Sequence, residues 1–571
     1  MAELSGPWLV GLMTTAVALI GMSALPWHAR ASRWVAVAIA VAMLGLCALL
    51  LMDLPADRAA VLSDPWDPSA LLGGPALLRF DILSSALLPF AVILFAVTVG
   101  LAPTAILDRH VLRRQASALG LTLLAFATRD PIILAGCWTA SIGSLLLDLR
   151  GRADRRTLRI AAAYLLPSIA LIIGGLTLIS DTGSDGRLHT AGAVLVALAV
   201  MIRKGIFPLH SWLPEVFEHG HLGSTMAFCA PQLGTWVAVT VLLPAAPTAV
   251  LSTVAALSLV TSVYGALAAL AQADARRALG WLFASQSALV LVGIESDSVR
   301  GLAGGLSVWL SSGLAFAGLA LALGVNEARR GRLRLDRLNG GYERMPMLAT
   351  SFLLLSLACF GFPGTFGFVA QELLVGGATD QFPHIGFLVI VATTLTAIAM
   401  IRMYFSLFCG ADPGRLPMRL LRRETAFLVA LTALVIIAGL APAQLIASRS
   451  AAAATLLEAR ERKQRLGWHL VPAEPTTEPA TEPTTEPTTW LAPGAPASVP
   501  AGRGPAATGY SHACLRRYGG DDVGVGAARL PGRPDEVAGI SPDRLPHEAA
   551  RSAKRAYSTT GHVQGDDNAE L

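Results

Sequence analysis

Two stretches of this 571-residue chain combine charged or polar side chains with helix-breaking residues inside long apolar runs. In the first, MIRKGIFPLHSWLPE, Lys204 ends an apolar run and Pro208 follows four residues later. In the second, GFPGTFGFVAQELL, Pro363 and its neighbouring glycines precede Gln371 and Glu372. Pro and Gly leave backbone groups that lipid cannot hydrogen-bond, so broken helices persist in membranes only where they face protein or water. Ionisable side chains beside such breaks indicate a path for an ion.

Each feature also has a purely structural interpretation. A lysine near a helix end can extend its ammonium group to the lipid headgroups, and a proline after it can simply end the helix. The break at Pro363 can be a packing kink. Both interpretations require that the apolar runs are transmembrane helices.

The composition places most of the chain in lipid. Apolar residues make up 54% of the sequence and charged residues 15%, far from the balance of a soluble domain. The net charge of +5 comes from short arginine clusters between apolar runs, which does not indicate a nucleic-acid surface. Four of the six cysteines lie in apolar runs without CxxC spacing, and no nucleotide-binding motif is present. We therefore expect no metal and no cofactor in this chain.

The length of the apolar runs predicts the number of helices. A bilayer core of about 30 Å requires roughly 20 apolar residues per helix, and such runs recur up to about residue 447. We expect an all-α polytopic membrane protein of about fourteen transmembrane helices. The expected spans are residues 7–26, 34–52, 82–101, 116–129, 131–148, 159–180, 189–208, 222–243, 248–271, 279–295, 300–324, 346–375, 385–408 and 425–446.

Arginine placement predicts the orientation of these helices. Loops after odd-numbered helices carry arginine clusters, such as residues 150–159 and 329–337, whereas the intervening loops carry Asp and Glu. Cytoplasmic loops are enriched in Lys and Arg. We therefore expect both termini outside the cytoplasm, and the acidic start at Glu3 favours a retained first helix over a cleaved signal peptide.

The chain divides into three segments. Residues 1–74 hold two helices and an outer loop, residues 75–447 hold helices three to fourteen, and residues 448–571 form a tail. The tail contains the repeat EPTTEPATEPTTEPTT and lacks a hydrophobic period, so we expect it to be disordered. The two breaks lie in helices seven and twelve, so a five-helix unit would recur upside down, as in transporters with inverted repeats.

The stretch from Lys204 to Glu215 resembles the KxxxPxHxWLPxA signature of the antiporter-like membrane subunits of respiratory complex I. The same family includes subunits of Mrp antiporters and of membrane-bound hydrogenases. Further stretches resemble family motifs in the same order: Asp81–Ser84 (DGLS), Asp130–Trp138 (D…WE), Gln232–Trp236 (KMGTY), Ser312–Gly318 (HGLSAAG) and Arg422–Glu424 (RRE). The last two are most similar to the M-type subunit.

This resemblance implies a proton-translocating subunit of a bacterial inner membrane, driven by redox chemistry in partner subunits. The implied proton path runs through buried ionisable residues and water. Lys204 occupies the lysine position of the seventh helix, and His210 belongs to the signature. The other family positions hold mostly neutral residues: Thr139, Gln232, Gln286, Ser312 and Gln371, with Glu372 one position later. We expect these side chains to line the path, with helix breaks at Pro208 and Pro363.

The neutral positions leave three functions open. The first is a proton-translocating subunit of a complex I-like or hydrogenase-like assembly. The second is a membrane subunit of a gradient-driven bicarbonate-uptake system, and the third is a structural subunit that has lost conduction. In each case the expected partners are other membrane subunits and lipid, with no nucleic acid. His219 and His221 flank Gly220, but two histidines without a third ligand do not indicate a metal site.

Overall fold

A computed structural model describes most of the membrane part of the chain. The described residues are 3–4, 7–23, 29–54, 62–63, 67, 77–103, 107, 109–180, 186–411 and 419–465. Within them, eleven helices are long and apolar enough to cross a membrane, and two shorter helices are also apolar. The predicted all-helical, multi-pass architecture is therefore confirmed. The tail expected to be disordered lies, from residue 466 onward, outside the described residues.

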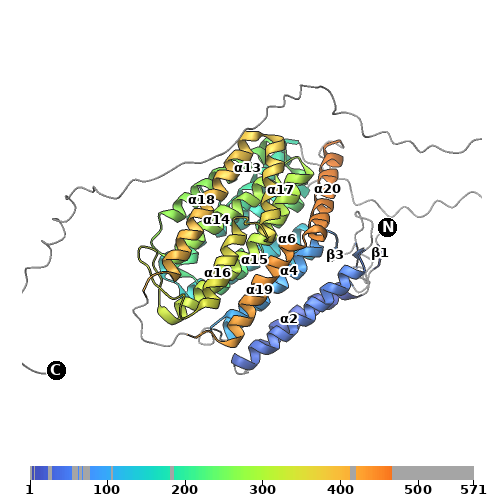
Figure 1. Cartoon of the computed structure of the whole chain (residues 1–571). Coiled ribbons are helices and arrows are strands. Elements are labelled where there is room, and N and C mark those ends of the chain that lie inside the picture. The colour runs from blue at the N-terminus through green and yellow to red at the C-terminus, as the bar shows by residue number, and fades with distance from the viewer. Residues whose placement is uncertain are drawn as a thin grey trace, which may run out of the picture. The chain divides into compact units, whose positions relative to one another are not determined.

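The helices follow one another in an antiparallel bundle (Figure 1). They are α1 (Trp8–Met22), α2 (Ala29–Met52), α4 (Ser84–Leu101), α5 (Arg109–Ala127), α6 (Pro131–Arg152), α7 (Arg155–Ser180), α8 (Gly186–Lys204), α9 (Trp212–His219), α10 (Leu222–Cys229), α11 (Leu233–Val237), α12 (Leu243–Ala245), α13 (Thr248–Leu270), α14 (Ala275–Ile294), α15 (Val299–Arg330), α16 (Pro346–Cys359), α17 (Phe366–Gln381), α18 (Pro383–Phe408), α19 (Arg422–Leu440) and α20 (Ala443–Arg465).

A small sheet of two-residue strands accompanies the helices. Strand β2 (Leu62–Ser63) pairs in parallel with β1 (Glu3–Leu4) and antiparallel with β3 (Arg79–Phe80). The sheet joins the start of the chain to the segment before α4, an element that the sequence did not predict.

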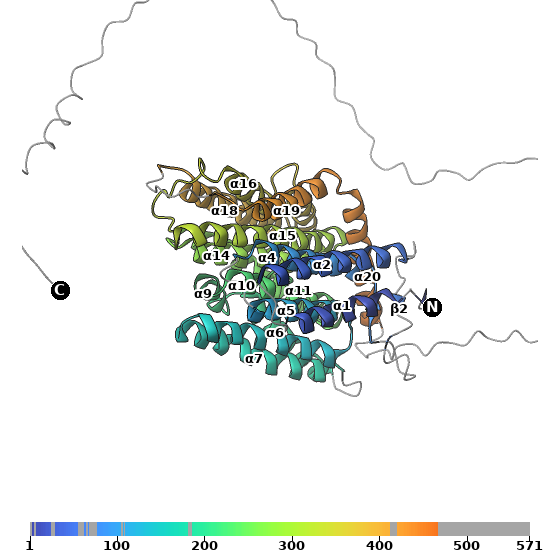
Figure 2. The same ribbon diagram turned by 90° about the horizontal axis from the view of Figure 1, so that it is seen from below.

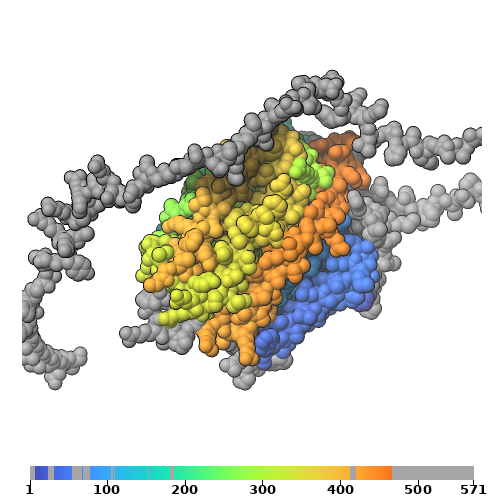
Figure 3. Space-filling model, viewed as in Figure 1, coloured from blue at the N-terminus to red at the C-terminus, as the bar shows by residue number. Residues whose placement is uncertain are grey.

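Helices α14 and α15 form the centre of the bundle. Of the apolar stretch of α14, 94% is buried inside the protein, against 33% for α7. In Figure 2 the two central helices lie between α16, α18 and α19 on one side and α5, α6 and α7 on the other. The outer helices expose large apolar side chains, including Trp34, Phe387 and Ile437, and α2, α18 and α19 form part of the surface drawn in Figure 3. Such a surface is suited to lipid.

The division between the expected fourth and fifth helices is confirmed. Helix α5 ends at Ala127, and α6 begins at Pro131. The Asp130 carboxylate caps α6 by accepting hydrogen bonds from the backbone N–H groups of Ile132 (2.8 Å) and Ile133 (2.9 Å). These contacts satisfy two of the free donors at the helix start, which is why the chain turns here.

The chain leaves the helix between α8 and α9, where the sequence analysis expected a break at Pro208. Lys204 is the last residue of α8, and the helix resumes at Trp212. Trp212 Nε1 donates to the carbonyl of Ile202 at 2.8 Å, and the Phe207 N–H donates to Thr261 Oγ1 at 2.9 Å. Side chains of the protein thus satisfy backbone groups that a continuous helix would pair, as the bilayer requires.

Pro363 lies between the end of α16 and the start of α17, where the sequence analysis expected a second break. Gly361 and Gly364 adopt φ angles of +80° and +88°, a left-handed conformation that favours glycine. A Cβ atom on Gly361 would lie 2.9 Å from Cγ of Gln371. The glycine therefore allows both the turn and the close approach of the Gln371 side chain.

The eighth helix, expected to be continuous over residues 222–243, is broken as well. Helix α10 ends at Cys229, and α11 begins at Leu233 and continues into a π-helix over Ala238–Leu242. Gln232 between them has a φ of +51°, the only positive φ of a non-glycine residue in the described part of the chain. Such backbone strain costs on the order of 1–3 kcal/mol and collects at functional sites.

The last expected span corresponds to α19, and a further helix that the sequence did not predict, α20, follows it. The tail was expected to be disordered from residue 448, but this is wrong for residues 448–465, because α20 continues to Arg465. Its alanines at 451–453 are buried, and Arg460 forms an ion pair with Asp297 at 3.1 Å. We attribute the helical conformation of α20 to this packing against the rest of the protein.

Asp81 connects the start of α4 to the turn between α5 and α6. Its carboxylate accepts from Arg129 at 2.5 Å and from the Ser84 N–H at 2.8 Å. Arg449 of α20 donates to the carbonyl of Ile82 at 2.8 Å. Burial alone would raise the pKa of Asp81, but Arg129 and the hydrogen bonds from Ser84 outweigh it and hold this pKa below its ordinary value of 3.8.

We predict that Asp81→Asn lowers the stability of the chain in detergent by about 1.5–3 kcal/mol, the contribution of a hydrogen bond to a charged group. Because folding lowers the pKa of Asp81, its contribution is present above the ordinary pKa and is lost only as pH falls through the folded value. Thermal unfolding should therefore show the same loss from about pH 8 down to about pH 5. Asp336→Asn, which removes an exposed pair with Arg334, is the control and should have little effect. A loss that varies strongly across this pH range would argue against the assignment.

Candidate ion path at the helix breaks

Lys204 lies where the breaks of the seventh and eighth helices meet. Its buried Nζ donates to Oε1 of Gln232 and, at 2.7 Å, to Oγ1 of Thr235. The Thr235 hydroxyl donates in turn to Oε1 of Gln232 at 3.2 Å. Within the described part of the chain, no carboxylate forms an ion pair with Lys204. Its charge is therefore held by neutral groups.

Gln232 and Thr235 can serve Lys204 in either protonation state. An ammonium group only donates hydrogen bonds, whereas a neutral amine also accepts one. The Thr235 hydroxyl can act as donor or acceptor, and Nε2 of Gln232 has no partner among the described residues. If the side-chain amide of Gln232 rotated by 180°, its Nε2 would donate a hydrogen bond to the neutral amine of Lys204. The site can therefore gain or lose a proton without leaving Lys204 unsatisfied.

A small cavity touches the lysine. It offers about 10 Å³ to the centres of water molecules, and its walls include Arg203, Lys204, Gln232 and Ser287. One water needs roughly 10–15 Å³ by this measure and at least two polar partners. The cavity is therefore about large enough for a single water beside Lys204.

A second polar cluster joins α14, α17 and α18. Gln371 Nε2 donates to Gln286 Oε1 at 3.1 Å, and Gln286 Nε2 donates to Thr396 Oγ1 at 3.4 Å. All three residues are buried. The structure thus brings together two of the site residues predicted from the sequence, and it adds Thr396.

Helix α14 lies between the two polar clusters. Gln286 belongs to the second cluster, and the next residue, Ser287, lines the cavity beside Lys204. Consecutive helical residues point about 100° apart, so one turn of α14 faces both clusters. This helix therefore contributes a residue to each cluster.

Two predicted path residues point elsewhere. Thr139 donates to the Ala135 carbonyl of its own helix and lines an apolar groove between α6 and α7. Glu372 is exposed, while its neighbour Gln371 is buried. The shift of one position noticed in the sequence therefore turns the carboxylate of Glu372 to the outside of the bundle.

Two others are buried but separate from Lys204. The His210 ring packs against Phe207, Tyr264 and Trp281, with ring centroids 5.1–5.7 Å away, and its Nδ1 has no hydrogen-bond partner in the described structure. Ser312 donates to the carbonyl one turn earlier in its own helix, at 3.4 Å. Among the described residues, neither side chain hydrogen-bonds to the two clusters.

Arg203 is a buried charge to which the sequence reasoning gave no role. Its Nη2 donates to Ser141 Oγ at 2.8 Å. Its guanidinium lies between two aromatic rings, 4.5 Å from the Trp138 centroid and 4.3 Å from that of Phe228. The sequence does indicate a role for this residue, because Arg203 directly precedes Lys204 inside an apolar run, where a charged side chain is costly.

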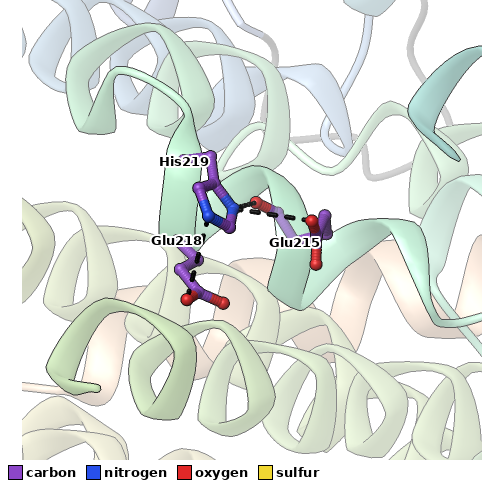
Figure 4. Close-up of side chains that lie close together, drawn as sticks. All are labelled: Glu215, Glu218 and His219. Carbon is purple, nitrogen blue, oxygen red and sulfur yellow. Dashed lines mark hydrogen bonds and ion pairs between the residues drawn. The ribbon is translucent and has the colours of Figure 1, made fainter. Parts of the chain in front are cut away.

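A cluster of carboxylates and a histidine lies near the end of α9. One atom each of Glu215, Glu218 and His219 lies within 4.8 Å of the others (Figure 4). Arg277 donates to Glu218 at 2.6 Å and to Glu215 at 3.3 Å. Arg277 thus offsets one of the two carboxylate charges, and we assign this cluster no metal. His221 does not join the cluster, because its Nδ1 accepts from the backbone N–H of Ser224 at the start of α10.

Comparisons with known proteins place this arrangement in a family. Residues 156–399 match the family described as NADH:quinone oxidoreductase/Mrp antiporter, TM. The chain is 31% identical to NADH-quinone oxidoreductase subunit N 2 of Solidesulfovibrio magneticus, over 58% of this chain and 75% of that protein. It is 30% identical to NADH-quinone oxidoreductase subunit 13 of Thermus thermophilus, over 55% and 73%.

Solved structures share the fold. A chain of respiratory complex I from Thermus thermophilus with bound NADH matches with a TM-score of 0.71 and 22% identity, over 79% of this chain and 99% of that one. A chain of the Mrp complex from Dietzia sp. DQ12-45-1b matches with a TM-score of 0.68 and 20% identity, over 80% and 98%. The architecture is that of an antiporter-like membrane subunit. The chain belongs to the NADH:quinone oxidoreductase/Mrp antiporter family of membrane subunits.

We predict that Thr235→Val destabilises the chain by about 1.5–3 kcal/mol, because it removes a hydrogen bond to a buried ammonium group. Thr240→Val is the matched control, since the Thr240 hydroxyl bonds only to a carbonyl of its own helix. Thermal unfolding in one detergent compares the two variants. Equal losses would show that Thr235 contributes nothing specific to Lys204.

Proposed function

We propose that this chain translocates protons across the membrane, coupled to redox chemistry in the partner subunits of a complex I-type assembly. Its proton carrier is Lys204. The observation that carries the proposal is the pairing of a buried lysine with two neutral side chains that can satisfy it in both protonation states. The relatives named NADH-quinone oxidoreductase subunits support the choice of assembly.

The proposed path runs along the middle of the bundle. A proton on Lys204 passes to water in the adjoining cavity and then along Ser287 toward Gln286 and Gln371. Amide and hydroxyl groups orient water but do not hold a proton at neutral pH. Lys204 is therefore the only described group on this path that can take up and release a proton, since the arginine beside the cavity, Arg203, stays protonated.

We also infer that the membrane part crosses the bilayer fourteen times and contains two five-helix units of opposite orientation. The first unit runs from α5 to α12 and the second from α13 to α18. Each contains one of the breaks predicted from the sequence, after α8 and after α16. The arginine-rich loops then face the cytoplasm of a bacterium, with the chain in the inner membrane.

A second candidate is a structural subunit that conducts no protons. It is favoured by the neutral residues of the second cluster and by the exposed side chain of Glu372. A third is a subunit of a gradient-driven bicarbonate-uptake system. Neighbouring genes separate the assemblies: complex I-type genes support the first candidate, and a large soluble zinc-binding partner supports the third.

We predict that Lys204→Ala and Lys204→Arg both reduce proton flux by at least about a hundredfold, the lower end of what one proton-transferring group contributes. Arginine keeps the charge but does not release its proton, so it should not restore flux. Flux is measured with a pH-sensitive dye in vesicles that contain the assembled complex, after the redox reaction is started.

Lys463→Arg is the control, because Lys463 lies near the end of α20, away from the helix breaks. It should leave the flux unchanged. Full flux in the Lys204→Ala variant would support the structural subunit instead. Full flux in Lys204→Arg alone would show that the position needs a charge and does not transfer a proton.

A further inference from the structure

Arg203 brings a second positive charge into the same region as Lys204. Within the described residues no carboxylate forms an ion pair with it, and its guanidinium donates to Ser141 Oγ at 2.8 Å and to the Trp138 carbonyl at 3.4 Å. An arginine side chain does not lose its proton in proteins. Charged groups inside a membrane are costly and nearly always pair with an opposite charge or with carbonyl groups. The guanidinium therefore lacks a counter-charge among the described residues.

The side chain of Arg203 borders a second cavity, enclosed by α5, α6, α8 and α10. This cavity offers about 30 Å³ to the centres of water molecules, room for roughly two waters. Four of its lining residues carry hydroxyl groups: Thr122, Ser141, Ser144 and Ser224. Most of the wall is apolar, so these residues, the charged side chains and one amide supply its polar part.

Gln115 provides an independent sign of a missing ligand. Its side chain lines the same cavity and is 1% exposed, yet neither Nε2 nor Oε1 has a hydrogen-bond partner in the described structure. A buried amide without partners costs free energy comparable to a lost hydrogen bond. Its Nε2 supplies a free donor on the wall that Arg203 also lines.

The charges around the cavity add up to one positive charge. Arg114 and Asp148 also line it, but they neutralise each other in an ion pair of 2.5 Å. Arg203 supplies the remaining charge, and it borders the small cavity beside Lys204 as well. A fixed arginine at the junction of two cavities repels cations and attracts anions.

We propose that this cavity binds one small monovalent anion of the halide type, held by the guanidinium of Arg203 and the amide of Gln115. One negative charge balances the net charge of the walls, and a phosphate dianion would exceed it. The bound anion stabilises the guanidinium between Trp138 and Phe228. This site is separate from the proton carrier, because Arg203 does not exchange protons.

The test is equilibrium binding of radioactive chloride (³⁶Cl⁻) to the purified full chain in detergent, with gluconate keeping the ionic strength constant. We expect saturable binding of about one chloride per chain, which bromide displaces. Arg203→Gln should abolish it, and Gln115→Ala should weaken it about tenfold, as expected for the loss of one hydrogen bond to a charged group. Arg449→Gln is the matched control, because Arg449 is equally buried but donates to backbone carbonyls of the segment before α4. It should keep the site intact.

No saturable chloride binding in the unaltered chain would overturn the proposal, and so would undiminished binding in Arg203→Gln. Gln115→Ala removes no charge, so it tests the site even if Arg203→Gln fails to fold. Unchanged chloride affinity in this variant would overturn the site as proposed. Proton flux does not enter this measurement, so its outcome is independent of the role of Lys204.

Discussion

The structure depends on one constraint: a lysine buried inside a membrane bundle needs polar partners that lipid cannot supply. The partners of Lys204 come from the broken eighth helix, where Gln232 adopts a left-handed backbone conformation and Thr235 follows within the next turn. Gly234 makes this approach possible, because a Cβ there would lie 3.0 Å from Cγ of Lys204. The break after α8 and the break before α11 therefore belong to one site.

Breaking two adjacent helices is possible because the protein supplies hydrogen bonds at the breaks. Trp212 donates to a carbonyl near the end of α8, and Trp309 of the central helix α15 donates to the carbonyl of Pro231 at 3.1 Å. Each indole also fills space, since both are fully buried. The same aromatic residues thus pack the core and satisfy the backbone at the site.

The apolar periodicity and the charge pattern could predict much of this fold. They identified the membrane helices, the breaks at Pro208 and Pro363, and Lys204, because a charge inside a long apolar run is typical of a functional membrane helix. The break at Gln232 was missed because a single proline before it does not reveal which residue adopts a positive φ. Helix α20 was missed altogether, because its alanines gain their helical environment from tertiary packing.

Which side chains form the site was harder to predict than where in the sequence the site lies. Position in a motif does not give the direction of a side chain, which is why Thr139 and Glu372 face away from the clusters. Arg203 and Gln115 lie on different helices, 88 residues apart in sequence, and only the packing of α5 against its neighbours brings them to one cavity. Contacts of this kind depend on helix rotation, which sequence periodicity determines only coarsely.

The neutral partners of Lys204 are tested most directly by solid-state NMR of the full chain in lipid. The chain has only three lysines, at positions 204, 463 and 554, so ¹⁵N-lysine labelling gives few side-chain signals. We expect one Nζ signal, absent in Lys204→Arg, that correlates through space with the side-chain amide carbon of Gln232 and shifts in Thr235→Val. A correlation of that signal with a carboxylate carbon instead would contradict a lysine held by neutral groups.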